Sequence, residues 1–131
     1  MKNRLIRMNP TNVKAVGNYS HVTVIPKDAQ LYTFSGQIGA DENGILPDDY
    51  SKQIENTFKN IDLVLKCQSL TADDVIKVNI WAVEEIDWEN VFNPAWEKFF
   101  GKIYPSMTIA YISALGLPEI KIEIEIWAAK A

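Results

Sequence analysis

The stretch Lys-Ile-Glu-Ile-Glu-Ile-Trp, residues 121–127, alternates apolar and polar side chains without a break. Successive side chains of a β-strand point to opposite faces, so its isoleucines are expected on one face of a sheet. Glu123, Glu125 and Trp127 are then expected on the other face. We predict a strand over residues 119–128 with one face in the core and one face that carries carboxylates and a tryptophan.

Upstream of this strand, the hydrophobic pattern predicts two helices and further strands. Apolar residues recur at helical spacing from Asp48 or Asp49, either of which can cap the helix, to about Gln68. Asp87 is expected to cap a second helix over residues 88–101. Strands are predicted over residues 4–10, 19–26, 29–39 and 106–115, with a hairpin at Asp28-Ala29 between the second and third. Residues 70–83 are predicted to form a turn followed by a strand. The pattern therefore predicts an α+β fold, one sheet with two helices on one face.

The sheet face opposite the helices is expected to be both polar and aromatic. In the predicted register it carries Lys77, Asn79, Trp81, Glu123, Glu125 and Trp127. Tryptophans on a sheet face more often mark an interface than a surface in water. We expect a homo-oligomer that buries this face, and the alternative is that long loops cover it. Ile76 and Val78 are expected on the helix-facing side.

Composition narrows the class of protein. The chain has 131 residues, 47% of them hydrophobic and 23% charged, which is typical of one globular domain, residues 1–131. The formal net charge of -4 argues against a nucleic-acid partner, because phosphate binding needs a basic surface. No apolar run is long enough to cross a membrane. A single cysteine, Cys67, suits a reducing compartment, and we expect a cytoplasmic protein.

No familiar catalytic or metal-binding motif stands out from the residues alone. His21 is the only histidine and Cys67 the only cysteine, so neither a nucleophile–base pair nor a metal site is expected. No glycine-rich phosphate loop is present, and no cofactor is expected. The stretch Phe34–Gly39 is of more interest, because Gly36 would let a ligand approach the backbone closely. A bulge or a turn is the alternative interpretation.

Several segments occur in an order that resembles a known family. They are Gly17-Asn18-Tyr19-Ser20, "SGQIG" followed by an Asn-Gly turn, "QIENTFKNIDLVL", "DDVIKVNIW", "VFNPAWEKFFG", "YPSMT" and "KIEIEIWA". Together they resemble the RidA/YjgF family, also called endoribonuclease L-PSP-like, over about residues 13–129. The resemblance implies a chorismate-mutase-like fold. It also implies a homotrimer whose sheets form a central barrel, with small-molecule clefts between adjacent subunits.

The resemblance also implies a set of site residues. Active members hydrolyse reactive enamines and imines made from amino acids, and release ammonia and a 2-oxo acid. Tyr19, Ser35 with Gly36, and Asn93 match the family's substrate-binding positions. Glu123 matches the glutamate that helps to position the attacking water, and Glu125 is the alternative.

One position departs from the family pattern. Active members carry an arginine two residues after the proline that leads the strand, and this chain has Met107 there. A thioether cannot replace the two-pronged contact of a guanidinium with a carboxylate, a loss of about 2–5 kcal/mol in binding. Two hypotheses follow: a hydrolase that acts on a small molecule lacking a carboxylate, with Glu123 as general base, or a non-catalytic ligand-binding or regulatory trimer. An endoribonuclease fits the net charge least well.

Overall fold

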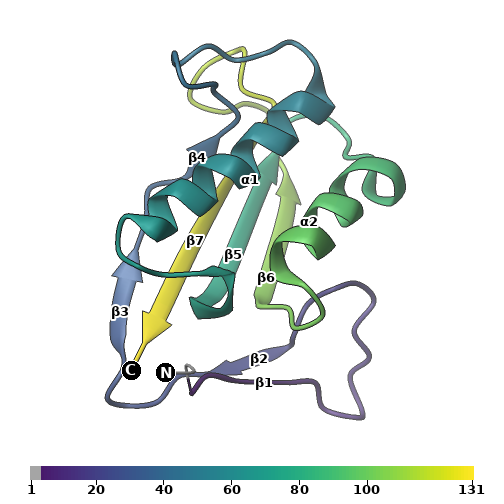
Figure 1. Cartoon of the computed structure of the whole chain (residues 1–131). Helices are drawn as coiled ribbons and strands as arrows, with labels where there is room; N and C mark the ends of the chain where they lie inside the picture. Colours follow the sequence, from purple (N-terminus) through teal and green to yellow (C-terminus); the bar gives the residue numbers. More distant parts are fainter. Residues whose placement is uncertain (1–3) are drawn as a thin grey trace.

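The predicted C-terminal strand is the centre of the main sheet in the computed structural model, which describes residues 4–131. This strand, β7, spans Ile122–Lys130. It pairs antiparallel with β5 (Val75–Ala82) on one side, and with β3 (Gln30–Thr33) and β4 (Gln37–Ile38) on the other. The edge strand β6 (Ser106–Tyr111) runs parallel to β5. The sheet is therefore mixed, with the order β3-β7-β5-β6 (Figure 1).

Two helices cover one face of this sheet, as the sequence predicts (Figure 1). They are α1 (Tyr50–Lys66) and α2 (Asn93–Phe100). A short 3₁₀ helix, η1 (Ala72–Asp74), precedes β5, and a π-helical turn, η2 (Trp88–Phe92), precedes α2. The α+β fold with a mixed sheet and two helices is thus confirmed. Within the described residues, none of the helices combines the length and apolar character needed to cross a membrane.

The core lies between the helices and the isoleucine face of β7. Ile122, Ile124 and Ile126 are at most 1% exposed, and they pack against the buried stripe of α1. In β5, a register shift between Val75 and Lys77 adds one residue to the strand. Because of this bulge, Val75 joins the core cluster in place of the predicted Ile76.

The N-terminal strands form a separate two-stranded ribbon, so the predicted hairpin at Asp28-Ala29 is wrong. The strand β2 (Val22–Val24) pairs with β1 (Ile6–Met8), while β3 pairs with β7. The turn itself forms, since Ala29 N donates to Pro26 O at 3.0 Å, but it carries the chain from one sheet to the other. Arg7 attaches the ribbon to the domain by donating to the carbonyls of Asp73 (2.7 Å) and Val75 (2.9 Å).

Three other predicted segments differ from the structure. The predicted strand 29–39 is divided between β3 and β4. The predicted helix 88–101 is divided between η2 and α2, although Asp87 caps its start as expected, accepting from Asn90 N. The predicted strand 106–115 ends at Tyr111. There the Tyr111 hydroxyl accepts hydrogen bonds from Ile86 N (3.0 Å) and Trp88 Nε1 (3.3 Å), which ties the end of the strand to the start of η2.

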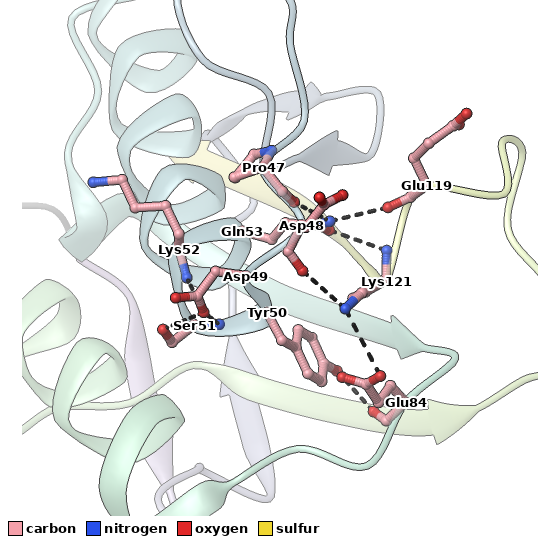
Figure 2. A network of polar contacts seen from close by, with 10 residues as sticks. All are labelled: Pro47, Asp48, Asp49, Tyr50, Ser51, Lys52, Gln53, Glu84, Glu119 and Lys121. Atoms are coloured by element: carbon pink, nitrogen blue, oxygen red, sulfur yellow. Dashed lines mark hydrogen bonds and ion pairs between the residues drawn. The ribbon is translucent and has the colours of Figure 1, made fainter.

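The start of α1 is fixed by side chains that bond to backbone groups (Figure 2). Of the two candidate caps it is Asp49 that acts, accepting from Ser51 N (2.9 Å) and Lys52 N (3.4 Å). Gln53 is buried at 1% exposure. Its amide group donates to Pro47 O and Glu119 O, and its oxygen accepts from Lys121 N. The segment that leads into β7 is therefore clamped to the first turn of the helix.

Candidate functional site

A cavity of about 320 Å³ lies where the loop between β1 and β2 meets the start of α2 and the edge strand β6. We call it the Met107 pocket. It is lined by Val16, Gly17, Asn18, Tyr19, Trp88, Phe92, Asn93, Trp96, Met107 and Ile109. Three residues that the resemblance predicts, namely Tyr19, Asn93 and Met107, therefore meet in one cavity.

The loop wall of the pocket is held by hydrogen bonds to α2 and to the segment before β6. Trp96 Nε1 donates to Asn18 O at 2.8 Å, and Asn18 Nδ2 donates to Glu97 Oε1 at 3.0 Å. The Ser20 hydroxyl donates to Tyr104 O at 2.6 Å. These contacts position Tyr19 at the rim without occupying the cavity.

The opposite wall comes from the π-helical turn η2. Both Val91 N and Phe92 N donate to Asp87 O, at 3.1 and 3.0 Å, and the backbone N–H of Asn93 donates to Trp88 O. The wider turn directs Trp88, Phe92 and Asn93 to the same cavity. Such turns are rare and occur frequently at functional sites, which makes this pocket a candidate functional site.

The pocket is apolar, with a few polar groups at its edge. No lysine or arginine is among its lining residues. The Tyr19 hydroxyl accepts a hydrogen bond from Val16 N at 3.2 Å and can still donate one. The Asn93 side chain makes no hydrogen bond to residues 4–131, so its amide is available to a ligand. This arrangement suits an uncharged molecule with one or two polar atoms.

The remaining predicted residues, Ser35, Gly36 and Glu123, lie elsewhere, beside β7. A Cβ atom on Gly36 would lie 2.1 Å from Glu123 Oε2, so the glycine leaves room for that carboxylate against the backbone. Ser35 is exposed on the same loop, and its carbonyl accepts from Gln37 Nε2 at 3.0 Å.

The two glutamates of β7 differ in their surroundings. The Glu125 carboxylate accepts a hydrogen bond from Asn79 Nδ2 at 3.0 Å, across the strand pair. The Glu123 carboxylate is half-buried and has no hydrogen bond or ion pair with any of residues 4–131. Of the two, Glu123 is the one whose oxygens are available for other contacts.

Within one chain, Met107 and Glu123 lie on opposite faces of the sheet. Met107 is in register with Val78 and packs against the core, which places it on the helix-facing side. Glu123 lies between the buried Ile122 and Ile124, so it points to the other side, the open sheet face. The structure thus brings Tyr19, Asn93 and Met107 together, and Gly36 and Glu123 together, but it does not join the two groups.

Sequence reasoning missed the aromatic lining of the pocket. Trp88, Phe92 and Trp96 all fall within the single helix predicted over residues 88–101, and Phe92 and Trp96 are 1% exposed. Their spacing of four residues is the signal that places them on one side, but it does not distinguish a core from a cavity wall. In residues 4–131 no three His, Cys, Asp or Glu side chains are grouped closely enough to hold a metal ion.

Comparison with solved structures supports the fold. The structure of YyfB from Yersinia pestis, a protein of unknown function of the conserved Rid family, superposes with a TM-score of 0.84 over 98% of both chains. At 22% sequence identity this likeness concerns the fold alone. The structure of YEO7 from yeast superposes with a TM-score of 0.68 at 26% identity, over 97% of this chain and 99% of that one.

Comparison with known sequences supports the family. A RutC family protein from Buchnera aphidicola subsp. Schizaphis graminum is 31% identical over 120 residues, 89% of this chain and 91% of that protein. The 2-iminobutanoate/2-iminopropanoate deaminase of Salmonella typhimurium is 27% identical over 100 residues, 73% of this chain and 77% of that enzyme. Residues 10–130 match the family model described as endoribonuclease L-PSP. The chain therefore belongs to the endoribonuclease L-PSP family, the RidA/YjgF family that its motifs resemble.

Proposed function

We propose that this protein binds a small molecule without a carboxylate, in clefts between the subunits of a homotrimer. The Salmonella relative is named as a deaminase of 2-iminobutanoate and 2-iminopropanoate, which are both carboxylates. The observation that carries our proposal is the lining of the Met107 pocket, which contains no lysine or arginine. A carboxylate that left water for this pocket would lack a counter-charge, and such burial is strongly unfavourable.

The walls of the pocket favour an apolar or aromatic ligand. Trp88 of η2 and Met107 and Ile109 of β6 offer apolar surface from two different parts of the chain. A flat ring can pack against an indole edge or a thioether, and these contacts favour aromatic molecules. Tyr19 and Asn93 would orient the ligand through hydrogen bonds to its polar atoms.

The open sheet face supports assembly. Trp127 is 39% exposed there, opposite Lys77 in the strand pairing, and Trp81 lies opposite Glu123. A face of this kind is better suited to contact with other copies than to water. A trimer with a central barrel would bury it, and adjacent subunits could then bring the Glu123 of one chain towards the Met107 pocket of the next.

Catalysis within that cleft is a second candidate function, favoured by the unpartnered carboxylate of Glu123. It would take a proton from water while the oxygen attacks the carbon of an uncharged imine, and it would then pass that proton to the imine nitrogen. The carbinolamine formed then expels ammonia and leaves a carbonyl compound. Tyr19, Ser35 and Asn93 would supply hydrogen bonds. If the trimer only binds or regulates, Glu123→Gln leaves binding unchanged and no substrate is turned over.

Ligand preference tests the proposal through position 107. Wild type is expected to bind phenylacetamide more tightly than phenylacetate in isothermal titration, and Met107→Leu should keep this preference. Met107→Arg should reverse it, by about a hundredfold at most, because the guanidinium pairs with the carboxylate. The same variant is expected to gain ammonia release from 2-iminopropanoate. Tighter binding of the acid by wild type, or its rapid deamination of 2-iminopropanoate, would refute the proposal.

A panel of uncharged imines and acylated amines tests the catalytic candidate separately. Turnover by wild type that Glu123→Gln abolishes, while Glu125→Gln retains it, would support hydrolysis with Glu123 as the base. Turnover that persists in Glu123→Gln would exclude that role.

A further inference from the structure

A second hollow lies between the two helices and shares no lining residue with the Met107 pocket. Its volume is about 630 Å³, and we call it the helix groove. That volume is in the range of small-molecule sites, about 300–1,000 Å³. α1, α2 and the start of η1 surround it, on the face of the sheet that both helices cover (Figure 1).

The floor of the helix groove is aromatic and firmly packed. Phe58 is 6% exposed and belongs to the core, and its ring centroid lies 5.6 Å from that of the half-buried Phe99. Ala72 and Ala95 add small apolar surfaces beside the rings. Small side chains next to two rings leave space for a flat apolar group to lie against them.

Acids and lysines line the groove in equal number, but they differ in their partners. Two acids line it, but each is paired with a lysine outside the lining: Glu55 with Lys52 at 3.3 Å, and Asp62 with Lys66 at 2.6 Å.

The groove's own lysines are Lys59 and Lys98, one on each helix. Neither forms an ion pair or a hydrogen bond with any of residues 4–131. The two lysines are therefore the charged side chains of the lining that have no partner in the described part of the chain, and they lie beside an aromatic floor.

We propose that the helix groove is a binding site for a small aromatic carboxylate. The ring would lie on Phe58 and Phe99, and the carboxylate would sit between the ammonium groups of Lys59 and Lys98. This ligand preference is the reverse of that proposed for the Met107 pocket, whose lining contains no cation and should disfavour a carboxylate. This inference does not depend on the function proposed for that pocket.

Amide NMR of the uniformly labelled full chain tests this proposal, with 2-naphthoate as the probe and 2-naphthamide as its uncharged match. Naphthoate is expected to shift the amide resonances of Lys59, Ala72 and Lys98. The double variant Lys59→Gln/Lys98→Gln should weaken this binding about fivefold or more, since two partly screened charge contacts are lost. Naphthamide should bind the groove of wild type as weakly as naphthoate binds that of the variant.

Lys14→Gln/Lys27→Gln is the matched control, because it removes the same charge from two exposed positions outside the groove. It should bind naphthoate like wild type. The proposal is overturned if acid and amide bind the groove equally, if both double variants lose the same affinity, or if the groove resonances do not move. Shifts of the Asn93 and Met107 amide resonances would instead report binding of naphthoate at the Met107 pocket. That result would contradict the function proposed for the pocket and would not bear on the helix groove.

Discussion

At Gly36, the lack of a side chain determines where the carboxylate of Glu123 can lie. A methyl group there would meet Glu123 Oε2 at 2.1 Å, and the Cδ and Cγ atoms of the glutamate at 2.8 and 2.9 Å. The atoms it meets belong to a flexible side chain and not to the backbone. A substitution should therefore displace the carboxylate and leave the fold intact.

We predict that Gly36→Ala changes the environment of Glu123 while its cost in stability remains small, about 1 kcal/mol. The carboxyl ¹³C resonance of Glu123 should move relative to wild type. Gly116→Ala is the control, since a Cβ atom at Gly116 has nothing within 4 Å. An unchanged Glu123 resonance in Gly36→Ala would show that the glycine does not set the position of the carboxylate.

Some residue-level features of the site could be predicted from the sequence and others could not. Tyr19, Asn93 and Met107 were expected in one site, and they do line one cavity. The sequence could not predict that Glu125 has a hydrogen-bond partner and Glu123 has none among residues 4–131, because this depends on which residue of β5 lies opposite each glutamate. Asn79 lies opposite Glu125, and that pairing follows from the bulge between Val75 and Lys77.

At the scale of elements, α1 shows how a few polar side chains position a helix on the sheet. Asp49 caps the start of the helix with a carboxylate. Gln53 joins the first turn to the segment before the helix at Pro47 and to the segment before β7 at Glu119 (Figure 2). Nearby, burial and the neighbouring Tyr111 and Glu84 raise the pKa of Tyr50, whose hydroxyl donates to Glu84 O at 2.8 Å.

Stability should depend on pH through Asp49. Hydrogen bonds from the Ser51 side chain and from the backbone of Lys52 and Ser51 lower the pKa of Asp49 from 3.8. Its contribution is therefore present above that value and is lost as the pH falls through the lower folded-state pKa. Asp49→Asn keeps an acceptor but cannot titrate. Urea unfolding should therefore show a smaller loss of stability in acid than wild type as the pH falls below about 4.

Asp48→Asn is the control for this prediction, because only the backbone carbonyl of Asp48 is engaged, by Lys121 Nζ at 2.9 Å. Its stability should follow the wild-type curve. Parallel curves for wild type and Asp49→Asn below pH 4 would show that the cap does not contribute to acid sensitivity.

Removal of the Gln53 amide should destabilise the fold. In Gln53→Leu, the carbonyls of Pro47 and Glu119 and the N–H of Lys121 lose their partner in a partly buried place. The expected cost is about 3 kcal/mol in the free energy of unfolding. Gln68→Leu, at an exposed position after the same helix, should change it by less than about 0.5 kcal/mol. Equal urea midpoints for the two variants would contradict the claim that the Gln53 hydrogen bonds stabilise the fold.

The type of most elements followed from hydrophobic periodicity, and their partners did not. The stripe of α1 and the alternation of β7 are strong local signals, and both elements form near the predicted residues. The hairpin at Asp28-Ala29 failed because the order of strands is a long-range property, and β7 provides β3 with a longer partner than β2. The π-helical turn η2 keeps the apolar spacing of a helix, so the pattern alone could not reveal it.

At the scale of the whole molecule, the two groups of site residues are separated by the sheet itself. Tyr19, Asn93 and Met107 are on the helix side, while Gly36 and Glu123 are on the open side. The open side also carries a partly exposed tryptophan at 127. A cleft that uses both groups therefore requires a second copy of the chain, and the proposed trimer is the assembly that would supply it.

Cross-linking between subunits tests this central claim most directly. In a Cys67→Ser background, which removes the only native cysteine, chains would carry Met107→Cys and Glu123→Cys and be treated with a short bis-maleimide. The sheet blocks a bridge between these two positions within one chain. The control pair is Leu63→Cys with Glu123→Cys, since Leu63 is an exposed position on α1. The account predicts a native mass three times the 14.9 kDa of the chain, and covalent dimers and trimers for the first pair only. A monomeric native mass, or a trimer in which the Met107–Glu123 pair gives no covalent products, would contradict it.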